Sequence, residues 1–253
     1  MSQCLICGND TILADGECPK CRYEKERNEK NTEPANYNSI ETEGRWNLDL
    51  TDMLISSADK LPGELIWPAQ NYLWEAELLY GKRSNQYPFN GSVDVSETAI
   101  SFVKPHYNIT GKMTVEQISN TIYLIKDCFK KGNEELRIFE LTREIIHAFS
   151  GTHNEDISNL ERGLAYSFCE ICMKKLPDGL IYFEDRIRQN EGHYYAYNIV
   201  KAIIAYDENT IKNLRKLPRI NGITSNIDEE CFEEANVKMP KELIKYLTSR
   251  LIM

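Results

Sequence analysis

Residues Glu134 to Ser150, EELRIFELTREIIHAFS, predict one long helix that is apolar over most of its surface. Residues three, four and seven positions apart share a helix face, so the polar side chains fall on one narrow stripe. This stripe consists of Glu140, Arg143, Glu144 and His147. Unpaired charge is costly in a protein interior. A mostly buried helix with such a stripe therefore indicates either a site that uses these groups or an internal ion-pair network.

Length and composition indicate a globular protein. The chain has 253 residues, enough for one full hydrophobic core and a small appended module. Its apolar runs are shorter than a membrane span, and Met1 to Asp10 contains no basic-then-apolar leader. We therefore expect a cytoplasmic protein with no membrane partner. The net charge of −9 argues against a broad nucleic-acid surface, which needs clustered Lys and Arg.

Four cysteines near the start of the chain predict a structural zinc site. Cys4 and Cys7 form one C-x2-C pair, Cys18 and Cys21 form a second, and ten residues separate the pairs. Four thiolates at this spacing can surround one zinc ion and leave no position for a substrate. Two disulfides are the alternative, which a reducing compartment disfavours. We therefore predict a zinc ribbon over residues 1–22, with Zn as its structural cofactor.

The residues around this ribbon predict a protein partner. Residues 1–31 carry five basic and six acidic side chains, a net charge of −1, so they provide no patch for phosphate groups. Residues 23–45 are polar and lack apolar periodicity, which predicts a linker. The main domain is then expected to span residues 46–253.

In the first half of the main domain, the patterns predict helices and one clear strand. Leu48 to Tyr80 contains two helical patterns, and Gly81 to Ser96 is expected to be a loop. Ala99 to Thr110 is the best strand candidate, and Pro105 within it suits an edge strand because proline cannot donate a ladder hydrogen bond. Apolar residues at spacings of three and four predict an amphipathic helix over Val115 to Phe129.

The second half of the main domain is expected to be helical throughout. Ile157 to Leu176 and Tyr182 to Asp207 each predict one helix, and a short amphipathic helix is expected from Lys241. Cys169 and Cys172 lie three residues apart and are expected to be buried thiols. The predicted fold class is α+β: a mostly helical domain with a small sheet, preceded by the zinc ribbon.

Three motifs between Ala99 and Tyr206 resemble the zincin group of zinc peptidases, in particular its gluzincin branch. They are Arg143-Glu144-Ile145-Ile146-His147, then Glu161-Arg162-Gly163-Leu164-Ala165, then Gly192-His193-Tyr194-Tyr195. Such peptidases hold zinc with a helical His-Glu-x-x-His, in which the glutamate activates water, and gluzincins add a glutamate from a later helix. The resemblance therefore implies a zincin-like fold for the main domain.

The resemblance also implies roles for individual residues. Glu144 matches the general base, His147 matches the second zinc ligand, and Glu161 matches the third. The candidates for a group that supports the oxyanion are His193, Tyr194 and Tyr195.

Arg143 occupies the position of the first zinc ligand, which departs from the family pattern. A guanidinium stays protonated and cannot coordinate a cation. We therefore predict that Arg143 replaces the zinc as a fixed internal cation. In this hypothesis it bonds Glu161 in a bidentate fork, and Glu144 or Glu140 accepts a further N–H group.

Simpler structural interpretations stay open for the same residues. Ser158 and Glu161 fit a capping box at the start of a helix, and His147 fits a core histidine bonded to a neighbour. Glu140 and Arg143 fit a simple ion pair along the surface of their own helix. A displaced second zinc held by His147, Glu161 and either His153 or His193 is a further alternative.

Two functions follow from these interpretations. In the first, a metallopeptidase-like domain with impaired catalysis serves as a protein-binding or regulatory module. In the second, the chain is an active zinc-dependent peptidase with altered ligands that acts on a protein substrate. The sequence does not decide whether the chain is an enzyme.

Overall fold

The computed structural model describes residues 2–3, 10–11, 60–84, 89–109, 115–151 and 157–250. The chain divides into two compact units, Met1–Asn47 and Leu48–Met253. In the first unit two short strands, β1 (Ser2–Gln3) and β2 (Asp10–Thr11), pair antiparallel. The four cysteines of the predicted zinc ribbon and the predicted linker lie outside the described residues, so both stay predictions.

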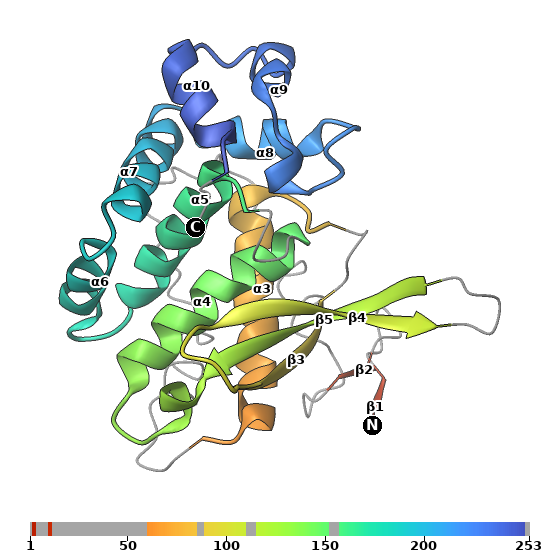
Figure 1. Cartoon of the computed structure of the whole chain (residues 1–253), viewed down its shortest axis with the longest axis vertical. Helices are drawn as coiled ribbons and strands as arrows, with labels where there is room; N and C mark the ends of the chain where they lie inside the picture. Colours follow the sequence, from red (N-terminus) through yellow and green to blue (C-terminus); the bar gives the residue numbers. More distant parts are fainter. Residues whose placement is uncertain are drawn as a thin grey trace, which may run out of the picture. The chain divides into compact units, whose positions relative to one another are not determined.

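The described part of the second unit is mostly helical and contains a three-stranded sheet (Figure 1). Its strands are β3 (Phe89–Ser96), β4 (Phe102–Ile109) and β5 (Val115–Ile125). Its α-helices are α3 (Ile66–Tyr80), α4 (Glu134–Ser150), α5 (Asn159–Met173), α6 (Gly179–Ile187), α7 (Glu191–Tyr206), α8 (Thr210–Lys216), α9 (Glu229–Glu234) and α10 (Lys241–Thr248). Three 3-10 turns are also described, η2 (Pro62–Leu65), η3 (Lys126–Phe129) and η5 (Thr224–Asn226). The predicted α+β class, mostly helical with a small sheet, is confirmed for this part of the chain.

The sheet has the order β3-β5-β4, so β5 is its central strand. β5 runs parallel to β3 and antiparallel to β4. The prediction of an edge strand around Pro105 is confirmed, because Pro105 lies in β4 at the edge of the sheet, opposite Asn120. A proline is tolerated there because its missing N–H group is needed by no further strand.

Two expectations for this region are wrong. Gly81 to Ser96 is not all loop, since β3 begins at Phe89. Val115 to Phe129 is not a helix but β5 followed by η3. In β5 the consecutive residues Asn120, Thr121 and Ile122 are all buried. A strand covered on both faces loses the alternation that marks a half-exposed strand, so its apolar residues can coincide with helical spacing.

The single helix expected over Tyr182 to Asp207 is also wrong, because the structure has two helices, α6 and α7. The side chain of Asn190 accepts a hydrogen bond from the backbone N–H of His193 at 3.1 Å and so caps the start of α7. An asparagine at this position satisfies a donor that the new helix leaves without an internal partner.

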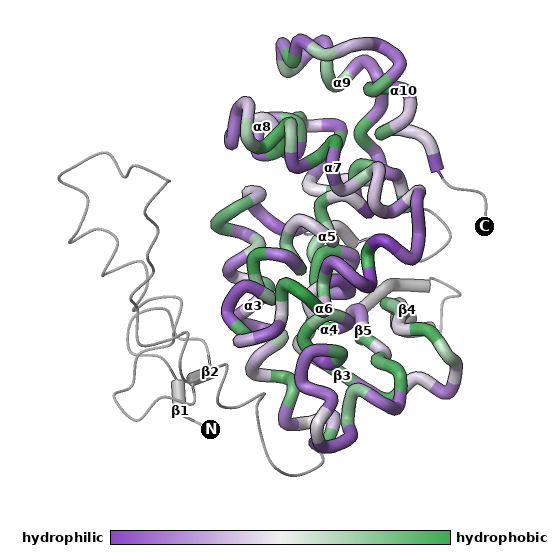
Figure 2. Tube along the Cα trace, turned by 90° about the vertical axis from the view of Figure 1, so that its left-hand side faces the viewer, coloured by the Kyte–Doolittle hydropathy of each residue, from purple (hydrophilic) through white to green (hydrophobic). Residues whose placement is uncertain are grey.

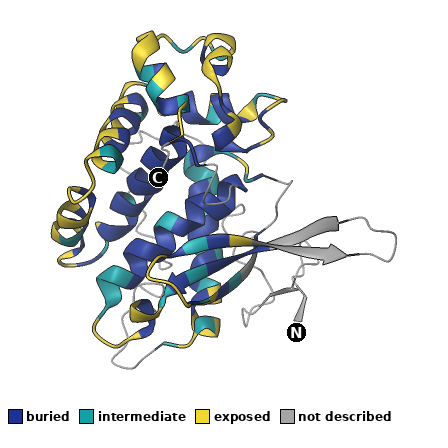
Figure 3. Cartoon of the chain, viewed as in Figure 1, coloured by how far each residue is buried: buried dark blue, intermediate teal, exposed yellow. Residues whose placement is uncertain are grey.

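Helix α4 has the predicted bounds, Glu134–Ser150, and lies at the centre of the second unit. It packs against α3, α5 and β5, and α5 lies between α4 and α7 (Figure 1). Figure 3 shows α4 and α5 as almost entirely buried, and Figure 2 shows hydrophobic stretches at α4 and the adjoining strands. Among the described residues no helix is long and apolar enough to cross a membrane.

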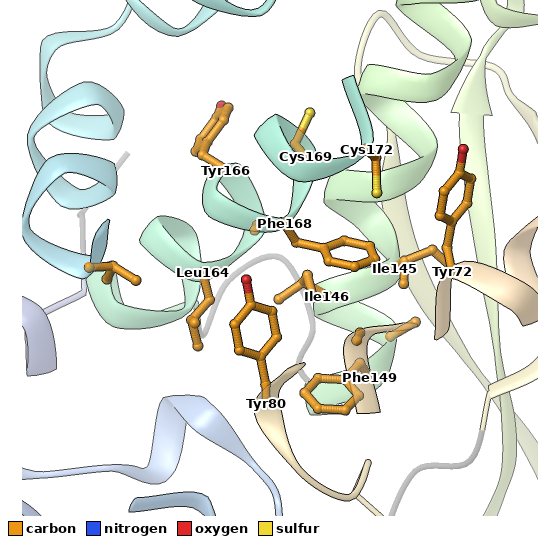
Figure 4. Close-up of a cluster of buried hydrophobic side chains, with 14 of the residues drawn as sticks. Tyr72, Tyr80, Ile145, Ile146, Phe149, Leu164, Tyr166, Phe168, Cys169 and Cys172 are labelled. Carbon is orange, nitrogen blue, oxygen red and sulfur yellow. The ribbon is translucent and has the colours of Figure 1, made fainter. Parts of the chain in front are cut away.

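Aromatic side chains fill the space between α3, α4 and α5 (Figure 4). The ring of Phe168 contacts the rings of Tyr72 and Tyr80 edge-on, with centroids 6.3 Å apart in both pairs. Cys169 and Cys172 are buried, as predicted, and burial raises the pKa of the Cys169 thiol to about 12. These cysteines are therefore inert core residues.

Gly163 brings α5 close to α7. A Cβ atom at this position would lie 2.5 Å from the carbonyl oxygen of Ala196 and would also overlap the Val200 side chain. Only glycine permits this approach of the two helices. The contact places the polar side chains of the first turn of α7 beside those of α5.

Candidate polar site on helices α4 and α5

Arg143 is bonded to two carboxylates of its own helix. Its Nη2 donates to Oε2 of Glu140 at 2.6 Å, and its Nε and Nη2 donate to Oε1 of Glu144 at 3.2 and 3.0 Å. Burial alone would lower the pKa of Arg143, but Glu140 and Glu144 raise it well above its ordinary value. Arg143 is therefore a permanent cation on the inner stripe of α4.

Glu144 uses only one of its two oxygens in this pairing. Its Oε2 is buried and has no hydrogen-bond partner in the described structure, and the residue as a whole is 2% exposed. A buried carboxylate oxygen of this kind costs free energy unless water or a ligand satisfies it.

A second pair links α4 to α5. His147 Nδ1 and Glu161 Oε1 lie 2.8 Å apart, and Glu161 Oε2 accepts a hydrogen bond from the Ser225 hydroxyl at 2.7 Å. Both His147 and Glu161 are buried. A carboxylate acts only as an acceptor, so His147 donates to Glu161 from Nδ1.

The capping box considered for Ser158 is present in an extended form. The Ser158 hydroxyl accepts a hydrogen bond from the Glu161 backbone N–H at 3.3 Å. The Glu161 side chain does not reach back by itself, because the Ser158 N–H donates at 3.0 Å to Ser225, whose hydroxyl then donates to Glu161. Ser225 comes from η5, and no local pattern pointed to it.

We call the five residues Glu140, Arg143, Glu144, His147 and Glu161 the α4–α5 polar cluster. Its arrangement differs from the predicted fork between Arg143 and Glu161. The Arg143 guanidinium donates to Glu140 and Glu144, while Glu161 pairs with His147 and Ser225. Helical spacing favours the first set, since Glu140 and Glu144 lie one turn or less from Arg143.

His193 belongs to a neighbouring group on α5 and α7. Arg162 Nη1 lies 3.2 Å from His193 Nε2, and the Tyr166 hydroxyl lies 2.9 Å from His193 Nδ1. Burial lowers the pKa of His193 to about 4, assisted by the nearby cations of Arg162 and Arg143. His193 is therefore neutral at pH 7, accepting from Arg162 at Nε2 and donating to Tyr166 from Nδ1.

The two tyrosines proposed beside His193 point elsewhere. Tyr194 and Tyr195 are 38% and 50% exposed. Tyr195 packs edge-on against Tyr246 of α10, with ring centroids 4.8 Å apart. Of the three candidates for an oxyanion-supporting group, the structure places only His193 beside the buried polar residues.

Arg215 is a buried residue of this region that the sequence did not single out. Its Nη1 donates to the hydroxyls of Ser150 at 3.3 Å and of Thr224, and its guanidinium lies over the Phe149 ring, 3.8 Å from the centroid. Burial lowers its pKa to about 9. Arg215 thus connects the end of α4 to η5 by hydrogen bonds, and η5 is the turn that contains Ser225.

The described residues do not fit a standard catalytic zinc. Among them no group of three or more His, Cys, Asp or Glu side chains is placed to hold a metal ion. Arg143 is paired with Glu144, and Glu161 is directed at Nδ1 of His147. His153, the further ligand considered for a displaced metal, lies outside the described residues.

No family model, no curated protein and no solved structure matches this chain. The geometry of the polar cluster is therefore the basis for a functional proposal.

Proposed function

We propose that this chain is a zinc-ribbon protein whose main domain is a metallopeptidase-like scaffold with impaired catalysis, serving as a protein-binding or regulatory module. The pairing of Arg143 with Glu144 carries this proposal. A general base needs a carboxylate oxygen that is available to accept a proton from water. Oε1 of Glu144 already accepts two N–H groups of Arg143, so this oxygen is poorly placed to activate water.

The order of the elements also supports the metallopeptidase-like scaffold. An edge strand, β4, comes before α4 with its Arg-Glu-x-x-His sequence, and α5 then carries Glu161. The resemblance implies this order of strand, motif helix and glutamate helix. The choice of a protein partner depends on the predicted ribbon, whose charge balance does not favour nucleic acid.

Arg143→His tests the proposal by restoring the missing ligand. In chains whose ribbon cysteines are already saturated with zinc, further zinc should leave the melting temperature of the wild type unchanged. It should raise that of Arg143→His, because a ligand that binds only the folded state stabilises it by about 2.7 kcal/mol at 100 times Kd. Arg188→His, at the exposed C-terminal end of α6, is the matched control and should not respond. A zinc-dependent shift in the wild type itself would contradict the proposal.

An active zinc-dependent peptidase with altered ligands is the second candidate. Two observations favour it: His147 and Glu161 contact each other from two helices, and Oε2 of Glu144 has no hydrogen-bond partner among the described residues. This alternative predicts that the wild type cleaves an unstructured protein such as casein and that Glu144→Gln abolishes the cleavage. Our proposal predicts no difference between the wild type and Glu144→Gln in this assay.

A further inference from the structure

Arg162 is a buried cation that lacks an anionic partner among the residues that the structure describes. It lies on α5 and is 9% exposed, and its side chain makes one hydrogen bond to a described residue, from Nη1 to the ring of His193. Its Nε is buried and has no partner within the described structure. The nearest acid, Glu161, is already bonded to His147 and Ser225. Glu161 acts on Arg162 through its charge but forms no ion pair with it in the described structure. A buried guanidinium without an ion pair costs free energy, so an added anion would stabilise it.

The N–H groups of Arg162 that make no hydrogen bond to the described residues, on Nε and Nη2, form a two-pronged fork. Nε and Nη2 lie on the same edge of the planar guanidinium, and their N–H bonds are parallel. Nη1, which donates to His193, lies outside this edge. Two parallel N–H donors match the two oxygens of a carboxylate or of a phosphate group.

Tyr166 contacts the same histidine ring and supplies a further donor. Because His193 accepts from Arg162 at Nε2, its proton lies on Nδ1 and is donated to the Tyr166 oxygen. The hydroxyl hydrogen of Tyr166 is then directed away from His193. Tyr166 follows Arg162 by four residues, so both side chains lie on the same face of α5, toward the partly exposed His193 of α7.

We propose that Arg162, Tyr166 and His193 form a binding site for the carboxylate group of a ligand. The charge balance favours a carboxylate over phosphate. Arg162 offers one positive charge, while Arg143 is already outweighed by Glu140 and Glu144. A phosphate dianion would leave excess negative charge beside Glu161, whereas a carboxylate matches the single cation. This site does not depend on the function proposed above.

Acetate is the simplest probe of this site, and NMR of the arginine side chains is the direct readout. In the full-length protein at pH 7, the Nε–Hε signal of Arg162, assigned by through-bond experiments, should shift saturably with sodium acetate. Sodium chloride at the same ionic strength should not reproduce the shift. The ring signals of His193 should follow with the same Kd, because His193 is bonded to Arg162.

Arg162→Lys keeps the charge but removes the fork, and should raise the acetate Kd read from His193 by about tenfold or more. Arg188→Lys, which alters an exposed pair on α6, is the control and should leave that Kd unchanged. An acetate shift no larger than the chloride shift would overturn the proposal. So would saturation by inorganic phosphate at a lower concentration than acetate. If Arg162→Lys does not fold, the wild-type titrations with acetate, chloride and phosphate still decide the question.

Discussion

Arg143 keeps its charge in the interior because Glu140 and Glu144 accept its N–H groups within one helical turn. Removing one partner of a buried ion pair costs about 3–5 kcal/mol, because the other charges remain buried without compensation. We expect Arg143→Ala to lower the free energy of unfolding, measured by urea denaturation, by about this amount.

Arg188→Ala is the matched control for this prediction. Arg188 pairs with Glu184 one turn earlier on α6, but both side chains are exposed. Exposed pairs of this kind contribute about 0.5 kcal/mol or less. Similar small losses for both variants would show that the Arg143 network does not stabilise the fold.

His193 makes the stability of the fold depend on pH. Its pKa is about 4 in the folded protein, lowered mainly by burial, against 6.5 for an ordinary histidine. Between these two values the unfolded chain binds more protons than the folded chain, so stability falls as the pH drops from 6.5 toward 4. Allowing for solvent screening of this partly exposed ring, the loss is on the order of 1–2 kcal/mol.

His193→Gln isolates this contribution. Glutamine can accept from Arg162 and donate to Tyr166, as His193 does, but it does not titrate in this range. Urea denaturation at pH 7 and at pH 4.5 should show a smaller loss for the variant than for the wild type. An equal loss in both proteins would show that His193 is not the responsible group.

Glu140, Arg143, Glu144 and His147 could be selected from the sequence because helical spacing places them on one stripe of α4, whereas Glu161 of α5 was selected by the resemblance. The predicted fork between Arg143 and Glu161 did not form, because Glu140 and Glu144 on the same helix are closer acceptors for Arg143. Ser225 could not be predicted, because 64 residues separate it from Glu161 and only tertiary packing brings them together.

At the scale of helices, Gly163 sets the distance between α5 and α7. A methyl group there would overlap the Ala196 carbonyl, and backbone cannot move as a flexible side chain can. Overpacking of this kind costs about 1–3 kcal/mol or more. We expect Gly163→Ala to lower the free energy of unfolding by at least this amount in urea denaturation.

Gly63→Ala serves as the control, because a Cβ atom at Gly63 would meet nothing within 4 Å. Gly63 is exposed in η2 and should tolerate alanine with little change. If Gly163→Ala is as harmless as Gly63→Ala, the close approach of α5 and α7 is not required for the fold.

Helices with a strong apolar period were predictable, and α4 has the predicted bounds. The strands were harder to predict from the sequence, because their burial differs. β4 is an edge strand whose proline is visible in the sequence, whereas β5 is central and buried on consecutive positions. The β-branched and aromatic residues of Val115–Ile125 were the available signal for a strand.

At the scale of the whole molecule, the proposal assigns zinc to one place only. The predicted ribbon supplies four thiolates, whereas the described part of the main domain contains no group of three or more metal-binding side chains. In this proposal only the ribbon binds zinc, and the number of zinc ions per chain tests it.

Elemental analysis of the purified full-length protein is the most direct measurement. We predict one zinc ion per chain, falling to none when Cys4 and Cys7 are both replaced by serine, because the four-cysteine site then lacks half of its ligands. Two zinc ions per chain, with one surviving the double replacement, would contradict the proposal and place a metal in the main domain.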